Sequence, residues 1–344
     1  MALRVRPITP ADEPAWDAFV HAHEHGSPFH LLAWRNSMRR IFGYAPRYLV
    51  AEEDGRIRAV LPLFLVSSPV TGRILLSTPF AVYGGVLADG DESRVAMGRA
   101  VEEEGRRERV QYVELRNAHE GQCLGFARVR RYVTFTQELS GTEENLLETI
   151  PRKTRAAVRK SLKFDFSSRP TREVEPFANL YLANLKRLGT PAFPLKHFRI
   201  LLEEFQAGAD IREMLLDGGL AAAVFVFYFR DQVLPYYGAS DPAFHPQQPN
   251  NYMYWELMRW GLNHGYRLFD FGRSKTQESG SFDFKAHWGM TMRELPYEIH
   301  LVRRRELPNF SPNNPRFHTF IRLWQSLPLP VANAIGPIVL KLVP

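Results

Sequence analysis

The residues most able to bind or transfer a charged group lie between positions 269 and 289. An apolar stretch ends at Asp270, and Gly272, Arg273 and Lys275 follow it directly. Ligands of open α/β sheets collect where the strands end. The guanidinium and ammonium groups suit phosphate or carboxylate oxygens, and glycine lets the backbone come close to a ligand. The pattern predicts an anion site beside the end of a buried strand.

The chain then returns through Phe282, Phe284 and Trp288, which surround Lys285 in the sequence. We expect these rings to wall a pocket for the ammonium group. The alternative interpretation is a solvated basic loop with aromatic anchors in the core. Asp270–Gly272 also matches a triplet of protein kinases, but neither a glycine-rich phosphate loop nor a His-Arg-Asp catalytic loop accompanies it. We therefore reject a kinase.

A second basic segment begins at Pro151, a residue suited to the first turn of a helix. At helical spacing, Arg152, Arg155 and Arg159 share one face, and Lys153 lies to the side. A helix start with free N–H groups and adjacent cations is a suitable anion site. The alternative is a solvated basic helix. Aromatic residues are not interleaved with the cations, which disfavours binding to single-stranded nucleic acid.

Other catalytic arrangements have little support. His21, His23 and His25 alternate in a predicted helix and point in different directions, so a metal site is not expected. Cys123 is the one cysteine, which excludes an intrachain disulfide and a zinc cluster of cysteines. The chain contains no Gly-x-Ser-x-Gly elbow, Walker loop or Rossmann glycine fingerprint. A covalent serine or cysteine mechanism is therefore disfavoured.

The composition describes a folded protein with an anionic partner. The 344 residues are 45% hydrophobic and 24% charged, which fits a soluble chain of two domains. The net charge of +7 suits phosphate, RNA, a nucleotide-sugar or a lipid headgroup, and it does not choose among them. We expect no DNA partner. No signal-peptide core and no apolar run of about 20 residues is present, so we expect a cytoplasmic protein.

The C-terminal segment Leu327–Pro344 is apolar but interrupted by prolines and a glycine. It either packs onto the body of the protein or lies on the inner face of the cell membrane.

Hydrophobic periodicity and turn residues predict alternating helices and strands. Helices are expected over 12–42 with a break, 91–107, 142–150, 151–163, 177–188, 195–205 and 252–264. Strands are expected in a hairpin over 47–66 and over 73–77, 82–87, 110–116, 211–216, 220–229, 233–239 and 267–271.

The two halves of the chain share one order of elements. Tyr83-Gly-Gly and Tyr237-Gly-Ala are each followed by a loop, a helix that ends near a glycine, and a strand. The separation is roughly 30 residues in both halves, as expected for two copies of one α/β unit.

Taken together, these features resemble the FemAB-like branch of the acyltransferase superfamily. The motifs that carry the resemblance are Pro151-Arg-Lys-Thr-Arg-x-x-x-Arg-Lys160, Tyr237-Gly-Ala-Ser240, Asn251 before a helix, Phe269-Asp-Phe-Gly-Arg273 and Phe282-Asp-Phe-Lys-x-x-Trp-Gly289. Within that branch, the motifs of this chain look most like those of the FemAB-related proteins of bacterial exosortase (PEP-CTERM) and exopolysaccharide systems. The resemblance implies two tandem GNAT-like domains of mixed α/β type, over 1–145 and 146–300, with a tail over 301–344.

The resemblance also implies a reaction. Characterised Fem ligases move an amino acid from aminoacyl-tRNA to the amine of a peptidoglycan precursor, and relatives are expected to use acyl-CoA. Lys285 matches a family lysine at the reacting ester, and Trp288 replaces the usual Phe. No coiled-coil arm for tRNA is seen, which weakens the tRNA donor. No tightly bound cofactor is implied.

Substrate-binding residues carry over from the same motifs. Basic residues of the helix motif and a tyrosine contact the precursor's phosphates and sugar in the family, and an N-terminal tryptophan lies near the precursor site. The residues expected to bind substrate are Lys153, Arg155, Arg159, Tyr237, Ser240, Asn251, Lys275, Phe284, Trp288 and Trp34.

The expected mechanism is direct acyl transfer to a neutral amine. Lys285 and Arg273 would stabilise the charge that develops on oxygen, and either Asp270 or Asp283 would take the amine proton. The expected acceptor is a sugar- or lipid-linked precursor of a cell-envelope polysaccharide or peptidoglycan. Two alternatives stay open: an acyl-CoA-dependent N-acetyltransferase of an amino sugar, although 245–251 lacks the usual pyrophosphate loop, and a non-catalytic polysaccharide-system scaffold.

Overall fold

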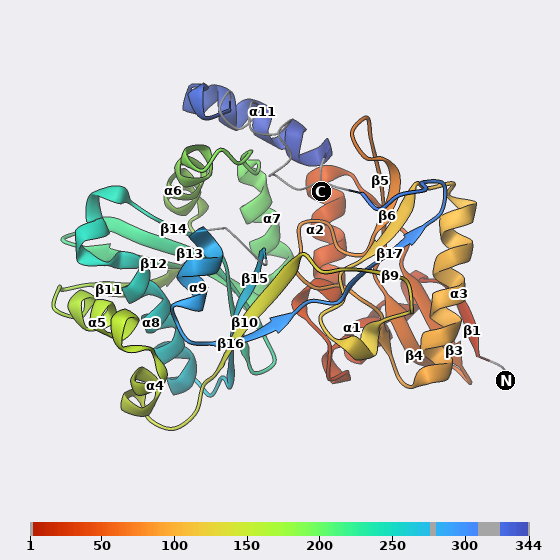
Figure 1. Cartoon of the computed structure of the whole chain (residues 1–344), viewed down its shortest axis with the longest axis horizontal. Coiled ribbons are helices and arrows are strands. Elements are labelled where there is room, and N and C mark those ends of the chain that lie inside the picture. The colour runs from red at the N-terminus through yellow and green to blue at the C-terminus, as the bar shows by residue number, and fades with distance from the viewer. Residues whose placement is uncertain (1–2, 276–279, 309–323, 343–344) are drawn as a thin grey trace. The chain divides into compact units, whose positions relative to one another are not determined.

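The computed structural model describes residues 3–275, 280–308 and 324–342, which form two units (Figure 1). Unit 1 contains 3–130, 295–308 and 337–342, and unit 2 contains 131–275, 280–294 and 324–336. The contacts thus divide the chain at 130/131 and 294/295, whereas the sequence placed boundaries at 145/146 and 300/301. Both units mix helices with sheets, which confirms the predicted α/β class.

Unit 1 carries two sheets. The first has the order β1 (Arg4–Pro7), β3 (Leu49–Glu53), β4 (Arg56–Leu61) and β7 (Leu87–Ala88). The second has the order β2 (Ala45–Pro46), β5 (Phe64–Ser68), β6 (Gly72–Leu76), β8 (Tyr112–Leu115), β17 (Tyr297–Leu301) and β9 (Ala127–Val129). The helices of this unit are α1 (Glu13–Ala22), α2 (Leu32–Phe42) and α3 (Asp91–Arg107).

The predicted helix over 91–107 is confirmed as α3, with acidic residues in its first turn and basic residues in its last. The predicted strand over 82–87 is wrong, because only Leu87–Ala88 is extended and paired there. At Gly84 and Gly85 a Cβ atom would lie 2.1 Å from Thr78 Oγ1 and Asn117 Oδ1, respectively. The glycines therefore mark a close passage of the backbone beside these two side chains, not a strand.

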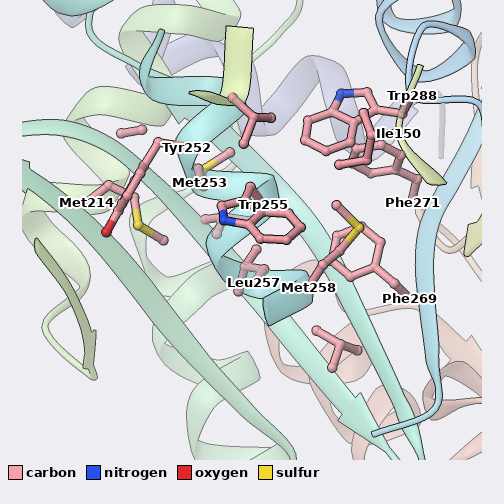
Figure 2. Packing of buried hydrophobic residues seen from close by; sticks show 14 of the residues in the cluster. Ile150, Met214, Tyr252, Met253, Trp255, Leu257, Met258, Phe269, Phe271 and Trp288 are labelled. Carbon is pink, nitrogen blue, oxygen red and sulfur yellow. The ribbon is translucent and has the colours of Figure 1, made fainter. Parts of the chain in front are cut away.

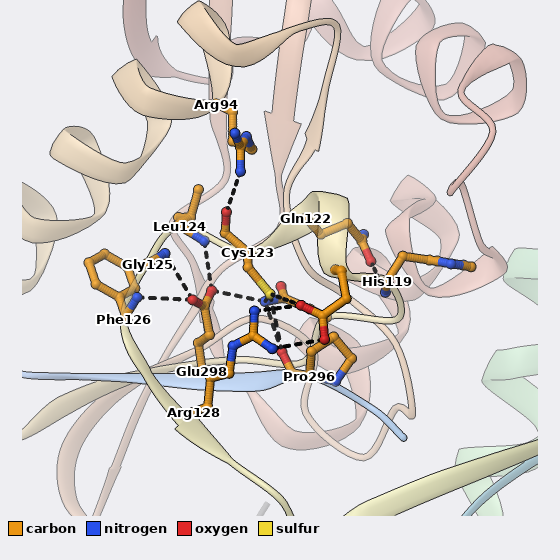
Figure 3. A network of polar contacts seen from close by, with 12 residues as sticks. Arg94, His119, Gln122, Cys123, Leu124, Gly125, Phe126, Arg128, Pro296 and Glu298 are labelled. Carbon is orange, nitrogen blue, oxygen red and sulfur yellow. Dashed lines mark hydrogen bonds and ion pairs between the residues drawn. The ribbon is translucent and has the colours of Figure 1, made fainter. Parts of the chain in front are cut away.

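A late segment of the chain completes unit 1. Glu298 of β17 is fully buried, and its carboxylate accepts hydrogen bonds from the backbone N–H groups of Leu124, Gly125 and Phe126 at 2.8–2.9 Å (Figure 3). Asn117 Nδ2 also donates to Glu298 at 3.0 Å. A buried carboxylate with these partners is satisfied, and it fixes the loop before β9.

Unit 2 is built on a seven-stranded mixed sheet. Its order is β11 (Ser167–Thr171), β12 (Ala209–Leu216), β13 (Gly219–Phe229), β14 (Gln232–Ser240), β15 (Leu268–Lys275), β10 (Tyr132–Glu138) and β16 (Thr291–Glu294). Its helices are α4 (Glu143–Thr149), α5 (Arg152–Ser161), α6 (Val174–Arg187), α7 (Leu195–Phe205), α8 (Pro249–Asn263) and α9 (Gly280–Ala286).

Helices cover both faces of this sheet. Tyr237 of β14 points to one face, where its ring contacts Tyr181 of α6 and Phe198 of α7. Gly238 points to the other face, where a Cβ atom would lie 3.1 Å from the hydroxyl of Tyr254 on α8. This alternation follows from the two-residue repeat of a strand. Around α8 the core is rich in large apolar side chains, and Figure 2 shows Trp255 with Tyr252 on one side and Phe269 on the other.

The two parallel strands of unit 2 pair over a short length only. β14 and β15 pair at Gln232↔Leu268 and Val233↔Phe269, after which β14 continues beside β13 and β15 beside β10. In unit 1 the parallel strands β6 and β8 likewise pair at two positions, with α3 between them in sequence. The order of strand, helix and strand is therefore present in both units, but in unit 1 the first parallel strand is β6 and not the predicted strand over 82–87.

The last helix, α11 (Leu329–Leu342), has residues assigned to both units. Its Gly336 packs against the backbone of Ala192 in unit 2, and Ala332 is buried. Across the described ranges, no helix has both the length and the apolar content required to cross a bilayer.

Candidate active site

A β-bulge forms the centre of the candidate site. β15 pairs with β10 at Thr134↔Arg273 and Thr136↔Asp270, so the register shifts by one residue between these pairs. Gly272 lies in the bulge with φ +67°, a conformation that glycine adopts without strain. The buried carboxylate of Asp270 accepts hydrogen bonds from the Gly272 N–H at 2.7 Å and the Thr134 hydroxyl at 3.1 Å. Asp270 therefore fixes the shape of the bulge.

Lys285 of α9 lies against the carbonyl side of the bulge. Its Nζ donates hydrogen bonds to the carbonyl oxygens of Phe271 at 2.5 Å and of Gly272 and Arg273 at 3.1 Å each. Burial lowers the pKa of Lys285 to about 8, while the negative charge of Asp270 opposes the shift. The group is therefore a cation at neutral pH that loses its proton unusually easily.

Aromatic rings surround the same carbonyls. Phe271 makes an edge contact with Tyr254 of α8, at 4.5 Å between ring centroids, and it lies 5.9 Å from the ring of Trp288. Trp288 is buried, Phe284 is half-buried beside it, and Phe282 instead packs on Phe135 of β10. The sequence identified Phe284 and Trp288 but not Tyr254. The sequence showed Tyr254 only as an aromatic residue of the predicted helix over 252–264, two residues after Tyr252 and on a different face of that helix.

The two cations that follow the bulge lie on one side of β15. The guanidinium carbon of half-buried Arg273 lies 4.5 Å from the centre of the Tyr132 ring. Burial and the charge of Arg273 lower the pKa of Lys275. Strand alternation places both residues on the side opposite buried Ser274. Residues 276–279 of the polar segment lie outside the described residues.

The two aspartates differ in their surroundings. The carboxylate of Asp270 is occupied by the bulge, which assigns it a positioning role. Asp283 is exposed on α9. Neither residue is identified as the base, and that assignment stays a prediction.

Contacts hold the basic helix α5 beside α9. The hydroxyl of Thr154 donates a hydrogen bond to the carbonyl of His287 at 2.6 Å, directly after α9. The ring of Pro151 lies so close to Gly289 that a Cβ atom there would approach it to 2.7 Å. The solvent face of α5 forms a depression of about 360 Å³, lined by Arg152, Arg155, Ala156, Arg159, Lys160 and Lys163. Lys153 is exposed beside this stripe.

Three residues expected at the substrate take part in local packing. Tyr237 is buried, and its hydroxyl bonds the Nε2 atom of His197 at 3.0 Å, so its ring belongs to the core beneath α6 and α7. Ser240 bonds His245 at 3.2 Å, and Asn251 donates to Gln248 at 2.9 Å, in and beside the turn before α8. None of them belongs to the group of three carbonyls that bind the ammonium of Lys285. Their substrate contacts stay predictions.

Trp34 belongs to unit 1. Its side chain is fully buried and makes an edge contact with Phe29 at 5.0 Å between ring centroids. A substrate would reach this ring only after local rearrangement, so the burial does not favour the predicted contact.

Neither a metal nor a thiolate is indicated in the described part of the chain. The histidines at 21, 23 and 25 do not join a group of three potential metal ligands there. Burial raises the pKa of Cys123 to about 11, so its thiol stays protonated at neutral pH and is a weak nucleophile.

The comparisons with known proteins concern the domain type and the fold. Residues 145–286 match the family model described as an acetyltransferase (GNAT) domain, and they lie within unit 2. No curated protein matches the chain. The crystal structure of FemX is similar, with a TM-score of 0.70 at 17% identity over 87% of this chain and 98% of that one.

Two further structures span both units. L-PGS from Bacillus licheniformis gives a TM-score of 0.54 at 14% identity, over 93% of this chain and 97% of that one. A tandem GNAT protein from the clavulanic acid biosynthesis pathway gives 0.52 at 12% identity, over 87% and 98%. These likenesses confirm the predicted tandem GNAT fold. Together with the acetyltransferase match, they support an acyltransferase of the GNAT type.

Proposed function

We propose that unit 2 transfers an acyl group to an amine of a phosphate-bearing acceptor, a sugar- or lipid-linked precursor of the cell envelope. The observation that carries the proposal is the ammonium of Lys285, with its lowered pKa, held by three carbonyls at the bulge. Helix α5, which carries the basic side chains, is fixed by a hydrogen bond to the turn that follows α9, the helix of Lys285. One unit thus combines a cation for a reacting oxygen with cations for an anionic substrate.

In the proposed reaction, the neutral amine attacks the carbonyl carbon of the donor. A C–N bond forms, negative charge develops on the carbonyl oxygen, and the bond to the leaving sulfur or oxygen then breaks. Lys285 stabilises that charge when its Nζ gives up the hydrogen bond to one of the three carbonyls and donates to the substrate oxygen instead. Arg273, the residue after Gly272 in β15, supplies a second positive charge. The amine proton passes to the leaving group, either directly or through a base that we do not assign.

The proposed donor is an acyl thioester such as acyl-CoA, the substrate of GNAT acetyltransferases. The separation of β14 from β15 supports this choice. Beyond Val233, within the described residues, β14 pairs with β13 but no longer with β15, so an extended donor chain has backbone groups to bond there. A charged tRNA is the alternative donor that the resemblance to Fem ligases suggests.

The proposed acceptor is anionic because the exposed face of α5 is basic. Lys153 and Arg159 are exposed, and half-buried Arg155 donates to the carbonyl of Glu148 at 3.3 Å. These three side chains are proposed to bind the acceptor phosphates. The donor-binding experiment below distinguishes an enzyme from the scaffold alternative, and transfer assays with a phosphate-bearing acceptor and with an amino sugar distinguish the two acceptors. The FemAB-like resemblance favours a polysaccharide or peptidoglycan precursor.

The first test is donor binding and transfer by Lys285→Met, which removes the charge and keeps most of the unbranched stem of the side chain. We expect transfer to fall by about 100-fold or more, as when an oxyanion-stabilising group is lost. Lys196→Met, an exposed lysine on α7, is the matched control.

Calorimetry with acetyl-CoA and with charged tRNA at two salt concentrations identifies the donor. CoA binding that survives moderate salt supports the proposal, and charged tRNA with a steep salt slope indicates an aminoacyl ligase. Unchanged transfer by Lys285→Met removes this residue from the mechanism. If neither donor binds, the scaffold alternative replaces the enzyme.

A further inference from the structure

The end of α5 combines exposed apolar side chains with unpaired cations. Leu162 is 48% exposed and Phe164 is 37% exposed, directly after the last turn of the helix. We use the term α5 surface for these two residues together with Arg152, Arg155, Arg159, Lys160 and Lys163. Contiguous exposed apolar patches rimmed by polar residues mark protein or membrane interaction sites.

The α5 surface is basic along its whole length. Its cations repeat at intervals of three and four residues, which aligns them on one side of the helix, while Thr154, Val158 and Ser161 face the core. No carboxylate lines the depression between them. Leu162 and Phe164 line a second depression that also contains Glu143, Glu144 and Glu256, and Arg259 forms ion pairs with Glu143 and Glu256. Within the described residues, none of these five cations forms an ion pair, and the nearest acid in the sequence is exposed Asp165.

The apolar residues favour a bilayer over a nucleic acid. Single-stranded nucleic acids bind basic grooves by stacking bases on aromatic rings, and Leu162 has no ring to offer. A bilayer surface suits both groups, because Leu and Phe enter the boundary between headgroups and acyl chains while Lys and Arg attract anionic lipids.

We propose that the α5 surface docks the protein on an anionic phospholipid bilayer, with headgroup phosphates in the basic depression and with Leu162 and Phe164 in the interface. Docking would place the Lys285 site beside lipid-linked molecules. Arg155 and Arg159 are shared with the proposed acceptor site, so the test uses Leu162, Phe164 and Lys163, which the proposed function does not assign. α11 also exposes apolar residues, such as Ile338 at 64%, yet Lys341 is its one cation. It lacks the charge complementarity that the α5 surface has.

The test is co-sedimentation of the full chain with vesicles of phosphatidylcholine, with and without phosphatidylglycerol. We expect binding to the anionic vesicles that weakens as salt is added. Leu162→Ser with Phe164→Ser should reduce binding by about tenfold, since it removes apolar area from the interface. Lys163→Glu should reduce binding and flatten its salt dependence. The matched controls are Ile338→Ser on α11 and Lys196→Glu on α7, which should bind nearly as wild type does.

Equal sedimentation with both vesicle types overturns the proposal, as does wild-type binding by the α5 variants. Loss of vesicle binding in Ile338→Ser would show that α11, and not the α5 surface, contacts the membrane, and it would overturn the proposal. Displacement of the protein from vesicles by an unrelated RNA at low concentration would identify the α5 surface as a nucleic-acid site. Because no acyl transfer is measured, these outcomes are independent of the donor experiments.

Discussion

At the scale of single residues, the proposed chemistry depends on the charge of Lys285. Burial lowers its pKa to about 8, so the side chain loses its charge as the pH rises through that value. A cation that stabilises a developing oxyanion acts only while it is protonated. We therefore expect the kcat/KM of the wild type to fall above pH 8, relative to Lys285→Arg, whose guanidinium stays charged.

The measurement is the pH profile of kcat/KM for both proteins with one donor and one acceptor. Their ratio cancels the titration of the acceptor amine, which both enzymes share. We take the ratio of the wild-type kcat/KM to that of Lys285→Arg. If this ratio rises through pH 8, the neutral amine of Lys285 is the active form, as for a base, and the oxyanion role is contradicted.

The sequence identified Lys285 but not the arrangement that holds it. Its type and its aromatic neighbours are local features, so they can be seen in the sequence. The carbonyl cradle depends on a bulge that is fixed by Asp270 and by Thr134, which lies 136 residues earlier in the chain. Tyr237 shows the opposite case: its motif suggested a ligand contact, while the structure turns its hydroxyl to buried His197. Long-range pairing decides both outcomes.

At the scale of elements, the site depends on how α5 meets the turn after α9. Gly289 has φ +71°, and a Cβ atom there would lie 2.7 Å from the rigid ring of Pro151. We expect Gly289→Ala to push α5 away from this turn, to lower the free energy of unfolding by about 1–3 kcal/mol, and to reduce transfer. Denaturant unfolding and steady-state kinetics measure the two effects.

Gly265→Ala is the matched control for this prediction. Gly265 also has a positive φ, +80°, but no atom lies within 4 Å of the position of its Cβ. Both variants carry the backbone strain, and only Gly289→Ala carries the clash. If both lose the same stability and activity, the contact between Pro151 and Gly289 does not position the site.

Many of the elements were predictable, because they have a local pattern. The sequence did not predict β9, β10, β11, β16, β17 or α9, although β10 and α9 form part of the candidate site. The bounds of α3 and α7 agree with the predicted helices, and β12, β13 and β14 lie where apolar runs and glycine turns placed them. The order of strands was not predictable. β10 and β16 form one edge of the seven-stranded sheet of unit 2, with β10 beside β15 and β16 beside β10. They come from opposite ends of unit 2 in the sequence, and no local signal specifies such pairings.

At the scale of the whole molecule, the chain returns to unit 1 after completing unit 2. β17 inserts between β8 and β9, pairing with both, and brings Glu298 to the backbone N–H groups of residues 124–126. Unit 1 is thus completed only by residues that follow the acetyltransferase match of unit 2. A contiguous N-terminal fragment would lack β17, an interior strand of its sheet, which explains why a boundary drawn along the sequence does not isolate this unit.

This return gives a prediction about stability that separates the two units. Glu298→Ala leaves the N–H groups of Leu124, Gly125 and Phe126 without their buried acceptor, and each unsatisfied group costs about 1–3 kcal/mol before water enters. We expect denaturant unfolding followed by hydrogen exchange to show lost protection in β8, β9 and β17, with β13 and β14 unchanged. Glu306→Ala, an exposed carboxylate in the same unit, is the control. Equal loss of protection in β13 and β14 would mean that the two units unfold as one cooperative structure, and the transfer activity of unit 2 would then depend on the carboxylate of Glu298.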